Sequence, residues 1–308
     1  MSREVRGSTF GVLRSPFDVR GAAFEPNGER RTENHERRVV VLKLGGELLE
    51  DPAHLEAVVS AIATIAAAAP LVIVHGGGKE IDAALRTAGI EKRQVDGLRI
   101  TDDETLEVVV AVLAGAVNTR LVAALNTAGV PAVGLTGADA ACGLALTAPP
   151  HQSVDGRIVE LGRVGVPADA ADSRLLRTLL AGRFVPVIAC IGMDADGRLL
   201  NVNADTFAGH LAARIGARRL VVAGTTPGVL DGNGSTLPVV DGHAVARLVT
   251  ERTATAGMIA KLRACEIALS GGVDEVVIVD GRDGAALEAA STGIAPASAT
   301  RLIRMVPA

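Results

Sequence analysis

Two glycine-rich turns, each directly after a run of aliphatic residues, are the features of this sequence best suited to chemistry. They read Lys43-Leu-Gly-Gly46 and His75-Gly-Gly-Gly78. A continuous apolar run is typical of a buried parallel strand. Glycine after such a strand lets the backbone approach an anion with its amides pointing outward. Two such turns, one with a lysine, indicate a site for phosphate, while glycine serving only the packing of a tight turn remains the alternative for either turn alone.

Three further side chains bear on this interpretation. A buried Lys43 calls for an anion, because an unpaired ammonium is costly to bury; the alternative is an amine that reaches solvent at the sheet edge. Lys261 falls in the first turns of a predicted helix, where a cation is locally unfavourable unless it meets a ligand. Arg99 is a candidate fork for a substrate carboxylate. His75 is better interpreted as a hydrogen-bonded core residue than as a catalyst.

A polar segment after another buried strand completes the set. Asn201, Asn203 and Asp205 occupy alternate positions, so an extended segment sends all three to one side. The alternative is that Asn203 or Asp205 caps the following helix. Lysines, an aspartate, an arginine and glycine turns are what phosphoryl transfer requires, since such enzymes mainly position phosphates and neutralise charge. The Walker and protein-kinase signatures are absent from the sequence, which excludes those kinase folds.

Bulk composition limits the partners. The 308 residues are enough for one large α/β domain or two joined lobes, with a core of aliphatic residues because only 2% are aromatic. The net charge of −4 and the lack of Trp and Tyr argue against a nucleic-acid partner. Cys142, Cys190 and Cys265 indicate neither a disulfide framework nor a zinc site, and are expected to be buried. We expect no membrane span, since no apolar stretch approaches about 20 residues. The cysteines fit a reducing cytosol and the N-terminus lacks the apolar segment of a signal peptide, so a cytoplasmic protein is expected.

The elements that must position these residues alternate between strand and helix from Val39 onward. Such alternation predicts a mostly parallel sheet with helices on both faces, and ligands then bind at the carboxyl ends of the strands. Residues 1–38, with eight Arg, six acids and scattered Gly and Pro, are expected to be an irregular or partner-ordered extension. Strands are predicted at 39–44, 71–75, 131–135, 184–191, 219–223, 275–279 and 302–305, and helices at 52–68, 79–88, 102–128, 173–181, 241–251, 257–270 and through Phe207, Leu211 and Ile215.

In this order, the motifs resemble the amino-acid kinase superfamily and, within it, the acetylglutamate kinases of arginine biosynthesis. The resemblance spans about residues 39–281, and Gly97-Leu-Arg99-Ile-Thr101 and Asn201-Val-Asn-Ala-Asp205 point to this group in particular. It implies an open αβα sandwich, with a lobe for the amino acid at about 39–190 and a lobe for ATP at about 191–308. The implied reaction is ATP-dependent phosphorylation of the γ-carboxylate of N-acetyl-L-glutamate by a homodimer or larger homo-oligomer.

The resemblance also implies roles for individual residues. Lys43 and Lys261 stabilise the transferring phosphoryl group, and Asp205 holds both lysines. The acceptor carboxylate is already ionised at neutral pH, so no general base is required. Mg²⁺ is held mainly by the phosphates of ATP, without a metal site made of protein residues. The substrate-binding candidates are Gly77, Gly78, Arg99, Asn201 and Asn203, and the phosphate- or ATP-binding candidates are Gly45, Gly46, Gly76, Thr225, Thr226, Gly228, Leu230, Gly257 and Met258.

Some segments depart from the family pattern. The nucleotide loop within 222–231 lacks the usual acidic residue after Thr or Ser, and residues 299–302 replace the usual Gly-Thr-x-Ile strand. Members inhibited by arginine carry an N-terminal helix that links dimers into hexamers; residues 1–38 are long enough, but their Gly and Pro disfavour a helix. Two alternatives therefore stay open: a sister kinase acting on acetylaminoadipate or aspartate, and a catalytically weak regulatory or ligand-binding homologue.

Overall fold

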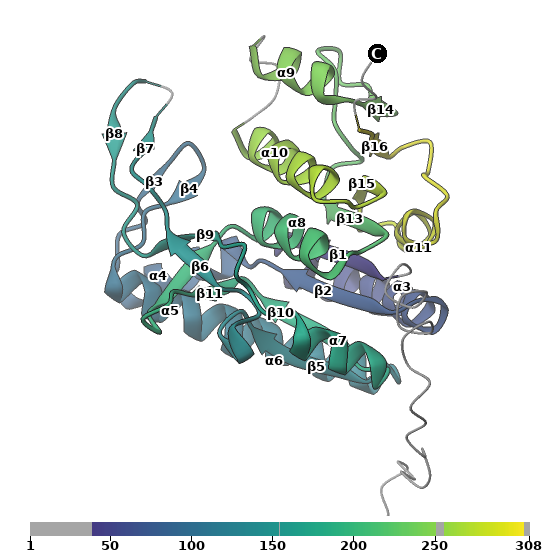
Figure 1. Ribbon diagram of the computed structural model, residues 1–308, viewed down its shortest axis with the longest axis horizontal. Coiled ribbons are helices and arrows are strands. Elements are labelled where there is room, and N and C mark those ends of the chain that lie inside the picture. The colour runs from purple at the N-terminus through teal and green to yellow at the C-terminus, as the bar shows by residue number, and fades with distance from the viewer. Residues whose placement is uncertain (1–38, 154, 251–255, 305–308) are drawn as a thin grey trace, which may run out of the picture.

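The computed structural model describes residues 39–153, 155–250 and 256–304, and the predicted extension lies outside them. Eight strands form one main sheet in the order β14-β16-β15-β13-β1-β2-β10-β5 (Figure 1). Neighbouring strands run parallel except for the β15–β16 pair. This confirms the predicted mostly parallel α/β sheet. The strands are β1 (Val40–Leu44), β2 (Leu71–His75), β5 (Ala132–Thr136), β10 (Val185–Ala189), β13 (Arg219–Gly224), β14 (Val239–Val240), β15 (Glu275–Asp280) and β16 (Thr300–Leu302).

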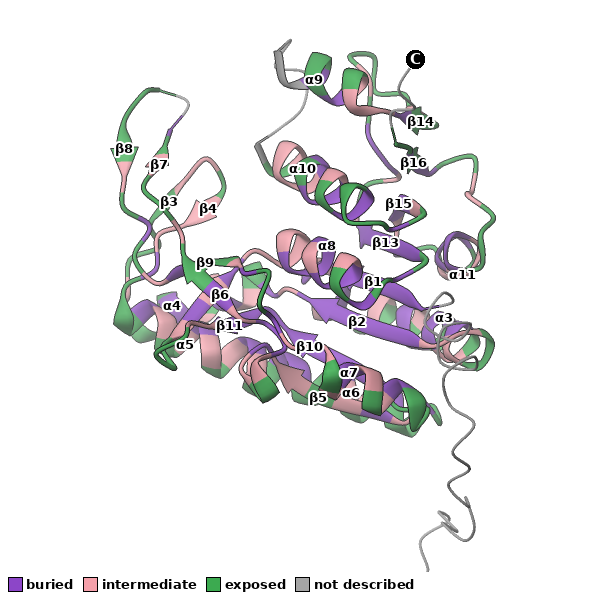
Figure 2. Cartoon of the chain, viewed as in Figure 1, coloured by how far each residue is buried: buried purple, intermediate pink, exposed green. Residues whose placement is uncertain are grey.

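Helices cover both faces of this sheet, and successive residues of each strand contribute to opposite cores. In β1, Val41 belongs to the core shared with α4, α8 and α10, whereas Leu42 belongs to the core shared with α3, α6 and α11. The buried strands lie between the two helical layers in Figure 2. The helices are α2 (Glu47–Glu50), α3 (Pro52–Ala68), α4 (Gly78–Ala88), α5 (Asp103–Val110), α6 (Asn118–Thr127), α7 (Arg174–Ala181), α8 (Ala204–Ile215), α9 (Gly242–Thr250), α10 (Ala256–Ser270) and α11 (Gly284–Thr292), with a short 3-10 turn at Asp139–Ala141.

A smaller four-stranded sheet and two hairpins lie beside the main sheet. The single strand predicted at 184–191 is wrong: β10 ends at Ala189, and β11 begins at Ile191 and pairs with β12 instead. The chain thus leaves the main sheet at Cys190. The two lobes predicted from the sequence share the main sheet, and their boundary stays a prediction. The smaller strands are β6 (Ala145–Thr147), β9 (Val164–Pro167), β11 (Ile191–Met193) and β12 (Leu199–Val202), and the hairpins pair β3 (Gln94–Val95) with β4 (Leu98–Arg99) and β7 (His151–Gln152) with β8 (Ile158–Val159).

One long helical stretch begins after Asp102, which caps it: the Asp102 side chain accepts a hydrogen bond from the Thr105 amide at 2.9 Å. It runs from α5 through a π-helical segment (Ala111–Val117) into α6. By length and composition alone it is long and apolar enough to cross a membrane, so the expectation that no stretch of this kind exists is wrong. Its buried side chains pack in the cores on the main sheet, as expected of a core helix: Val109, Leu113, Val117, Leu121 and Leu125.

Candidate functional site

The two glycine-rich turns meet at the carboxyl ends of β1 and β2. A Cβ on Gly46 would lie 2.5 Å from Gly77 Cα and 2.8 Å from Gly77 N, so the backbones approach more closely than any side chain allows. The amides of Gly45 and Gly76 already donate to Ala223 O and Leu44 O. Within the described part of the chain, the amides of Gly46 and Gly77 donate to no backbone acceptor outside the helices and strands. These two amides, at the starts of α2 and α4, are therefore available to an anion.

The close approach makes Gly46→Ala a direct test of this packing. We expect a loss of about 1–3 kcal/mol in the free energy of unfolding, the usual cost of overpacking, because backbone atoms cannot rotate away. Gly78→Ala is the matched control, since nothing lies within 4 Å of a Cβ at that position. Urea unfolding of both variants measures the difference. Equal stabilities would contradict the assigned contact between the turns.

Lys43 and Asp205 form a buried ion pair at the centre of the site. Lys43 follows Val41 on the same face of β1, and this face is covered by α8, which carries Asp205. Lys43 Nζ lies 2.9 Å from Asp205 Oδ1, with side chains 9% and 13% exposed. Burial lowers the pKa of Lys43, but the Asp205 carboxylate outweighs it and raises the pKa above its ordinary value. Burial raises the pKa of Asp205, and the two lysines, Lys43 and Lys261, bring it below its ordinary value. Both groups are therefore charged at neutral pH.

Lys261 projects from α10 toward the same centre. A Cβ on Gly224, at the end of β13, would lie 3.4 Å from Lys261 Nζ. Burial and repulsion by Lys43 lower the pKa of Lys261, and Asp205 only partly compensates. Lys43 is thus paired, whereas Lys261 carries a positive charge that no salt bridge within the described residues neutralises. Within the protein, only the through-space effects of Asp205 and Glu47 offset this charge.

The start of α8 separates the two interpretations of Asp205. Asn203 is the cap: its Oδ1 accepts hydrogen bonds from the amides of Asp205 and Thr206 at 3.0 and 3.1 Å. The Asp205 carboxylate accepts no backbone hydrogen bond there and instead pairs with Lys43. The capping interpretation is therefore correct for Asn203 and wrong for Asp205.

Arg99 lies on β4 and reaches over the start of α4. Its Nη2 donates to the Asp82 carboxylate and, at 3.3 Å, to Gly78 O. Nη1 is buried and has no hydrogen-bond partner. Asp82 therefore fixes the guanidinium while leaving a donor free for a ligand. On β12, Asn201 Nδ2 donates to Thr101 Oγ1 at 3.1 Å, which fixes the amide in the lining of the same pocket.

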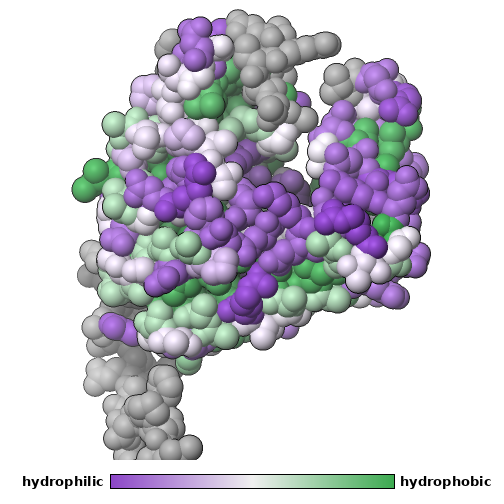
Figure 3. Space-filling model, turned by 180° about the vertical axis from the view of Figure 1, so that it is seen from behind, coloured by the Kyte–Doolittle hydropathy of each residue, from purple (hydrophilic) through white to green (hydrophobic). Residues whose placement is uncertain are grey.

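These elements surround a pocket of about 260 Å³. In Figure 3, the molecule is hollowed between its two projecting parts, and hydrophilic residues gather around the hollow. Glu47 and Cys190 also line the pocket, although neither was predicted to lie in the site. The position of Glu47 directly after the glycine pair was the only available signal for it. Ten predicted residues line the pocket: Lys43, Gly45, Gly46, Gly76, Gly77, Gly78, Arg99, Asn201, Asn203 and Asp205.

The other residues that were predicted to bind the nucleotide do not line this pocket. Gly228 is tightly packed, since a Cβ there would lie 2.4 Å from Thr300 Oγ1. That hydroxyl also accepts a hydrogen bond from the Val229 amide at 2.8 Å. Thr225 O accepts a hydrogen bond from Arg282 Nη2 at 3.0 Å. Contact with a nucleotide stays a prediction for these residues and for Thr226, Leu230, Gly257 and Met258.

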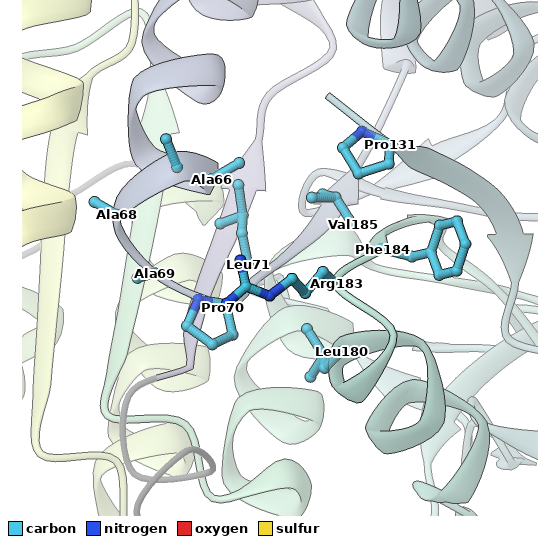
Figure 4. A pocket seen from close by; sticks show the side chains of 11 residues that line it. Ala66, Ala68, Ala69, Pro70, Leu71, Pro131, Leu180, Arg183, Phe184 and Val185 are labelled. Carbon is cyan, nitrogen blue, oxygen red and sulfur yellow. The ribbon is translucent and has the colours of Figure 1, made fainter. Parts of the chain in front are cut away.

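A second pocket, of about 340 Å³, lies at the opposite ends of the strands (Figure 4). It is lined mainly by apolar side chains, including Leu71 at the start of β2 and Val185 at the start of β10. Arg183 is its only charged lining residue. With a single charge and no group within reach of the glycine turns, it lacks the parts needed for phosphoryl transfer.

His75 and the cysteines take structural positions. His75 is fully buried, and burial lowers its pKa to about 4. Its Nδ1 lies 3.1 Å from Gly76 O and its Nε2 lies 3.0 Å from Asn118 Nδ2, an arrangement that suits the neutral Nδ1–H tautomer. The cysteines are buried free thiols, as predicted, and burial raises the pKa of Cys190 to about 12. These groups are neutral at physiological pH.

Comparison with known proteins matches residues 38–280 to the family described as amino acid kinase. The chain belongs to the amino acid kinase family. It is 40% identical over 255 residues to the acetylglutamate kinase of Novosphingobium aromaticivorans, covering 80% of this chain and 84% of that protein. It is also 40% identical over 243 residues to the acetylglutamate kinase of Methanopyrus kandleri, covering 78% and 94%. The resemblance drawn from the motifs is confirmed.

Among solved structures of the amino acid kinase fold, the N-acetylglutamate synthase of Neisseria gonorrhoeae, solved with coenzyme A and N-acetyl-glutamate, superposes with a TM-score of 0.73. The match covers 90% of this chain and 63% of that chain at 23% identity. At that identity the likeness shows the fold. It agrees with the αβα arrangement of one central sheet between two helical layers.

Proposed function

We propose that this amino acid kinase is an acetylglutamate kinase, which uses ATP to phosphorylate the γ-carboxylate of N-acetyl-L-glutamate in arginine biosynthesis. The relatives with this activity supply the substrate class. The observation that carries the proposal is the buried Lys43–Asp205 pair beside the unpaired Lys261, at the glycine turns. Two cations held by one carboxylate suit a phosphoryl group whose charge spreads over its oxygens during transfer.

The reaction needs little covalent chemistry from the protein. A γ-carboxylate oxygen of the substrate attacks the γ-phosphorus of ATP, the bond to the β,γ-bridging oxygen breaks, and ADP leaves with that electron pair. No proton has to move, because the carboxylate is already ionised. In this proposal, Lys43 and Lys261 stabilise the transferring group, Asp205 holds the lysines, and the amides of Gly46 and Gly77 bind phosphoryl and carboxylate oxygens.

Arg99 and Asn201 are proposed to bind the amino-acid end of the substrate. The free Nη1 of Arg99 supports this, since a buried guanidinium donor without a partner suits a carboxylate. Asn201 lines the same pocket and is proposed to offer its amide to the acetylamino group or the α-carboxylate. Asn203 holds the start of α8, so its contribution to substrate binding is proposed to be the placement of Asp205.

ATP would bring Mg²⁺ with it. The ion is proposed to be held mainly by the phosphates and by water. We further propose a cytoplasmic homodimer or larger homo-oligomer without a nucleic-acid or membrane partner. The nucleotide loop, with Thr225, Thr226, Gly228 and Leu230, and the start of α10, with Gly257 and Met258, are proposed to contact the nucleotide.

An acyl-phosphate assay tests the activity and the alternatives together. The enzyme is incubated with Mg-ATP and hydroxylamine, which converts an acyl phosphate to a coloured hydroxamate. The acceptors are N-acetyl-L-glutamate, N-acetyl-L-aminoadipate and L-aspartate. We expect the highest kcat/KM with N-acetyl-L-glutamate. A preference for another acceptor identifies a sister kinase, and no product from any of them favours a regulatory homologue, against which the intact lysine–aspartate arrangement argues.

Arg99→Lys is expected to raise KM for N-acetyl-L-glutamate by about tenfold or more, with a smaller change in kcat. The guanidinium contributes equally to the ground and transition states, and lysine lacks the planar fork that Asp82 fixes. Arg93→Lys, at an exposed arginine before the same hairpin, is the matched control. Steady-state kinetics of both variants decide the assignment, which an unchanged KM in Arg99→Lys would refute.

A further inference from the structure

Glu47 places a second carboxylate against the glycine turn, in a pocket otherwise arranged for anions. A Cβ on Gly45 would lie 2.4 Å from Glu47 Oε1 and 2.6 Å from Oε2, so the carboxylate lies directly over that glycine. A Cβ on Gly224 would lie 3.3 Å from the same Oε1 and 3.4 Å from Lys261 Nζ. Glu47 thus faces Lys261 across Gly224 and lines the pocket together with Lys43.

The Glu47 carboxylate is also uncommitted. It forms no hydrogen bond or salt bridge with any other residue in the described ranges, whereas the carboxylate of Asp205 is paired with Lys43. Helix α2, which begins with Glu47, has no side-chain cap. The charge of Glu47 acts on the nearby lysines only through space, where it raises the pKa of Lys43 and opposes the lowering of the pKa of Lys261. The carboxylate oxygens themselves therefore stay open to a ligand.

A free carboxylate here has a definite electrostatic consequence. Phosphate oxygens bound at the amides of Gly46 and Gly77 would lie beside it, and two anions at such a distance repel. A divalent cation between them turns the repulsion into attraction. Mg²⁺ prefers oxygen ligands and is usually bound by one or two carboxylates together with substrate phosphates. The uncommitted carboxylate therefore fits the ion that accompanies ATP.

We propose that Glu47 is a ligand of the nucleotide-bound Mg²⁺, directly or through one of its waters, and that it makes tight ATP binding dependent on the metal. The inference rests on the proposed function, because it takes the phosphates of ATP to lie at the glycine turns. It deepens that function by assigning the metal a protein ligand. The Glu47 carboxylate then repels the phosphates of metal-free ATP, whereas in Mg-ATP it binds the metal ion.

Binding of a non-hydrolysable ATP analogue tests the proposal without turnover. Calorimetry measures the Kd of β,γ-imido-ATP in excess Mg²⁺ and, separately, in excess EDTA, for the full chain and for Glu47→Gln. We expect Glu47→Gln to weaken binding of the Mg²⁺ complex by about tenfold or more, a typical effect of losing a partner of a metal site. Binding of the metal-free analogue is expected to stay unchanged or to improve. Glu56→Gln, at an exposed position of α3, is the matched control.

A second readout follows the metal itself. Electron paramagnetic resonance counts bound Mn²⁺ in the presence of the analogue, and its affinity for the complex is expected to fall in Glu47→Gln. Equal or tighter binding of the Mg²⁺ complex by Glu47→Gln would overturn the assignment, because a merely repulsive carboxylate gives that result. A wild-type chain that binds the analogue under neither condition would contradict the proposed function as well, so the two failures are distinguishable.

Discussion

Replacing Lys261 with alanine is expected to lower kcat by about two to three orders of magnitude, the effect of removing one preorganised donor from a developing charge. Lys261 forms no salt bridge with any residue that the structure describes, and burial and Lys43 already lower its pKa. Its removal breaks no salt bridge among the described residues, leaves Asp205 paired with Lys43, and relieves repulsion with Lys43. The melting temperature is therefore expected to equal or exceed that of the wild type, while turnover collapses. Hydroxamate kinetics and thermal unfolding measure the two effects.

Arg263→Ala is the matched control for this variant, since Arg263 is an exposed cation on the same helix. It should leave kcat unchanged. Turnover within about threefold of wild type in Lys261→Ala, well short of the loss expected for such a donor, would rule out the assigned role. Lys43→Ala is a less clean test, because it breaks a buried ion pair and leaves Asp205 without its nearest cation, which destabilises a fold by about 3–5 kcal/mol.

The main sheet was predictable because burial on both faces leaves a simple signature. The runs that form β1, β2 and β13 are apolar almost throughout, and every residue in them is buried. Helix starts were equally readable where a short polar side chain precedes an apolar period, as at Asp51 and Asp102. In these segments, local chemistry and the tertiary environment favour the same structure.

Segments without such agreement were missed or misjudged. β6 and β9 are short strands in a stretch rich in Gly, Pro and Asp, and their pairing depends on partners elsewhere in the chain. α11 was not predicted, although Asp283 caps it by accepting a hydrogen bond from the Ala286 amide. The break at Cys190 was invisible, because the apolar run continues through it while the chain changes sheets.

The candidate site likewise has some residues that the sequence predicted and others that it left undecided or missed. Residue types and spacing predicted that Lys43 and the two glycine turns lie close together, because the carboxyl ends of neighbouring parallel strands meet at one edge of the sheet. They left Asp205 undecided between a cap and a partner for lysine, because both roles need a short polar side chain after a strand. Glu47 was missed because its direction is set by the short helix α2, whose geometry depends on how the turn packs on Gly45 and Gly224.

Asp205→Asn is expected to lower kcat by about two orders of magnitude or more. It also breaks the buried pair with Lys43, so the free energy of unfolding is expected to fall by about 3–5 kcal/mol, as for Lys43→Ala. The change keeps the size of the side chain and removes the charge between Lys43 and Lys261. Asn203, which caps α8, is untouched. Asp51→Asn is the matched control: Asp51 caps α3, and Asn caps a helix about as well as Asp, so that variant should be silent.

The pH dependence of Asp205→Asn separates a charge effect from simple mispositioning. The Asp205 carboxylate raises the pKa of Lys43 and opposes the lowering of the pKa of Lys261. Without it, both lysines lose their protons at lower pH than in the wild type. The alkaline limb of kcat should therefore move to lower pH in Asp205→Asn and stay in place in Asp51→Asn. Wild-type turnover, or reduced turnover with an unshifted alkaline limb, would show that Asp205 does not act by holding the charges of the two lysines.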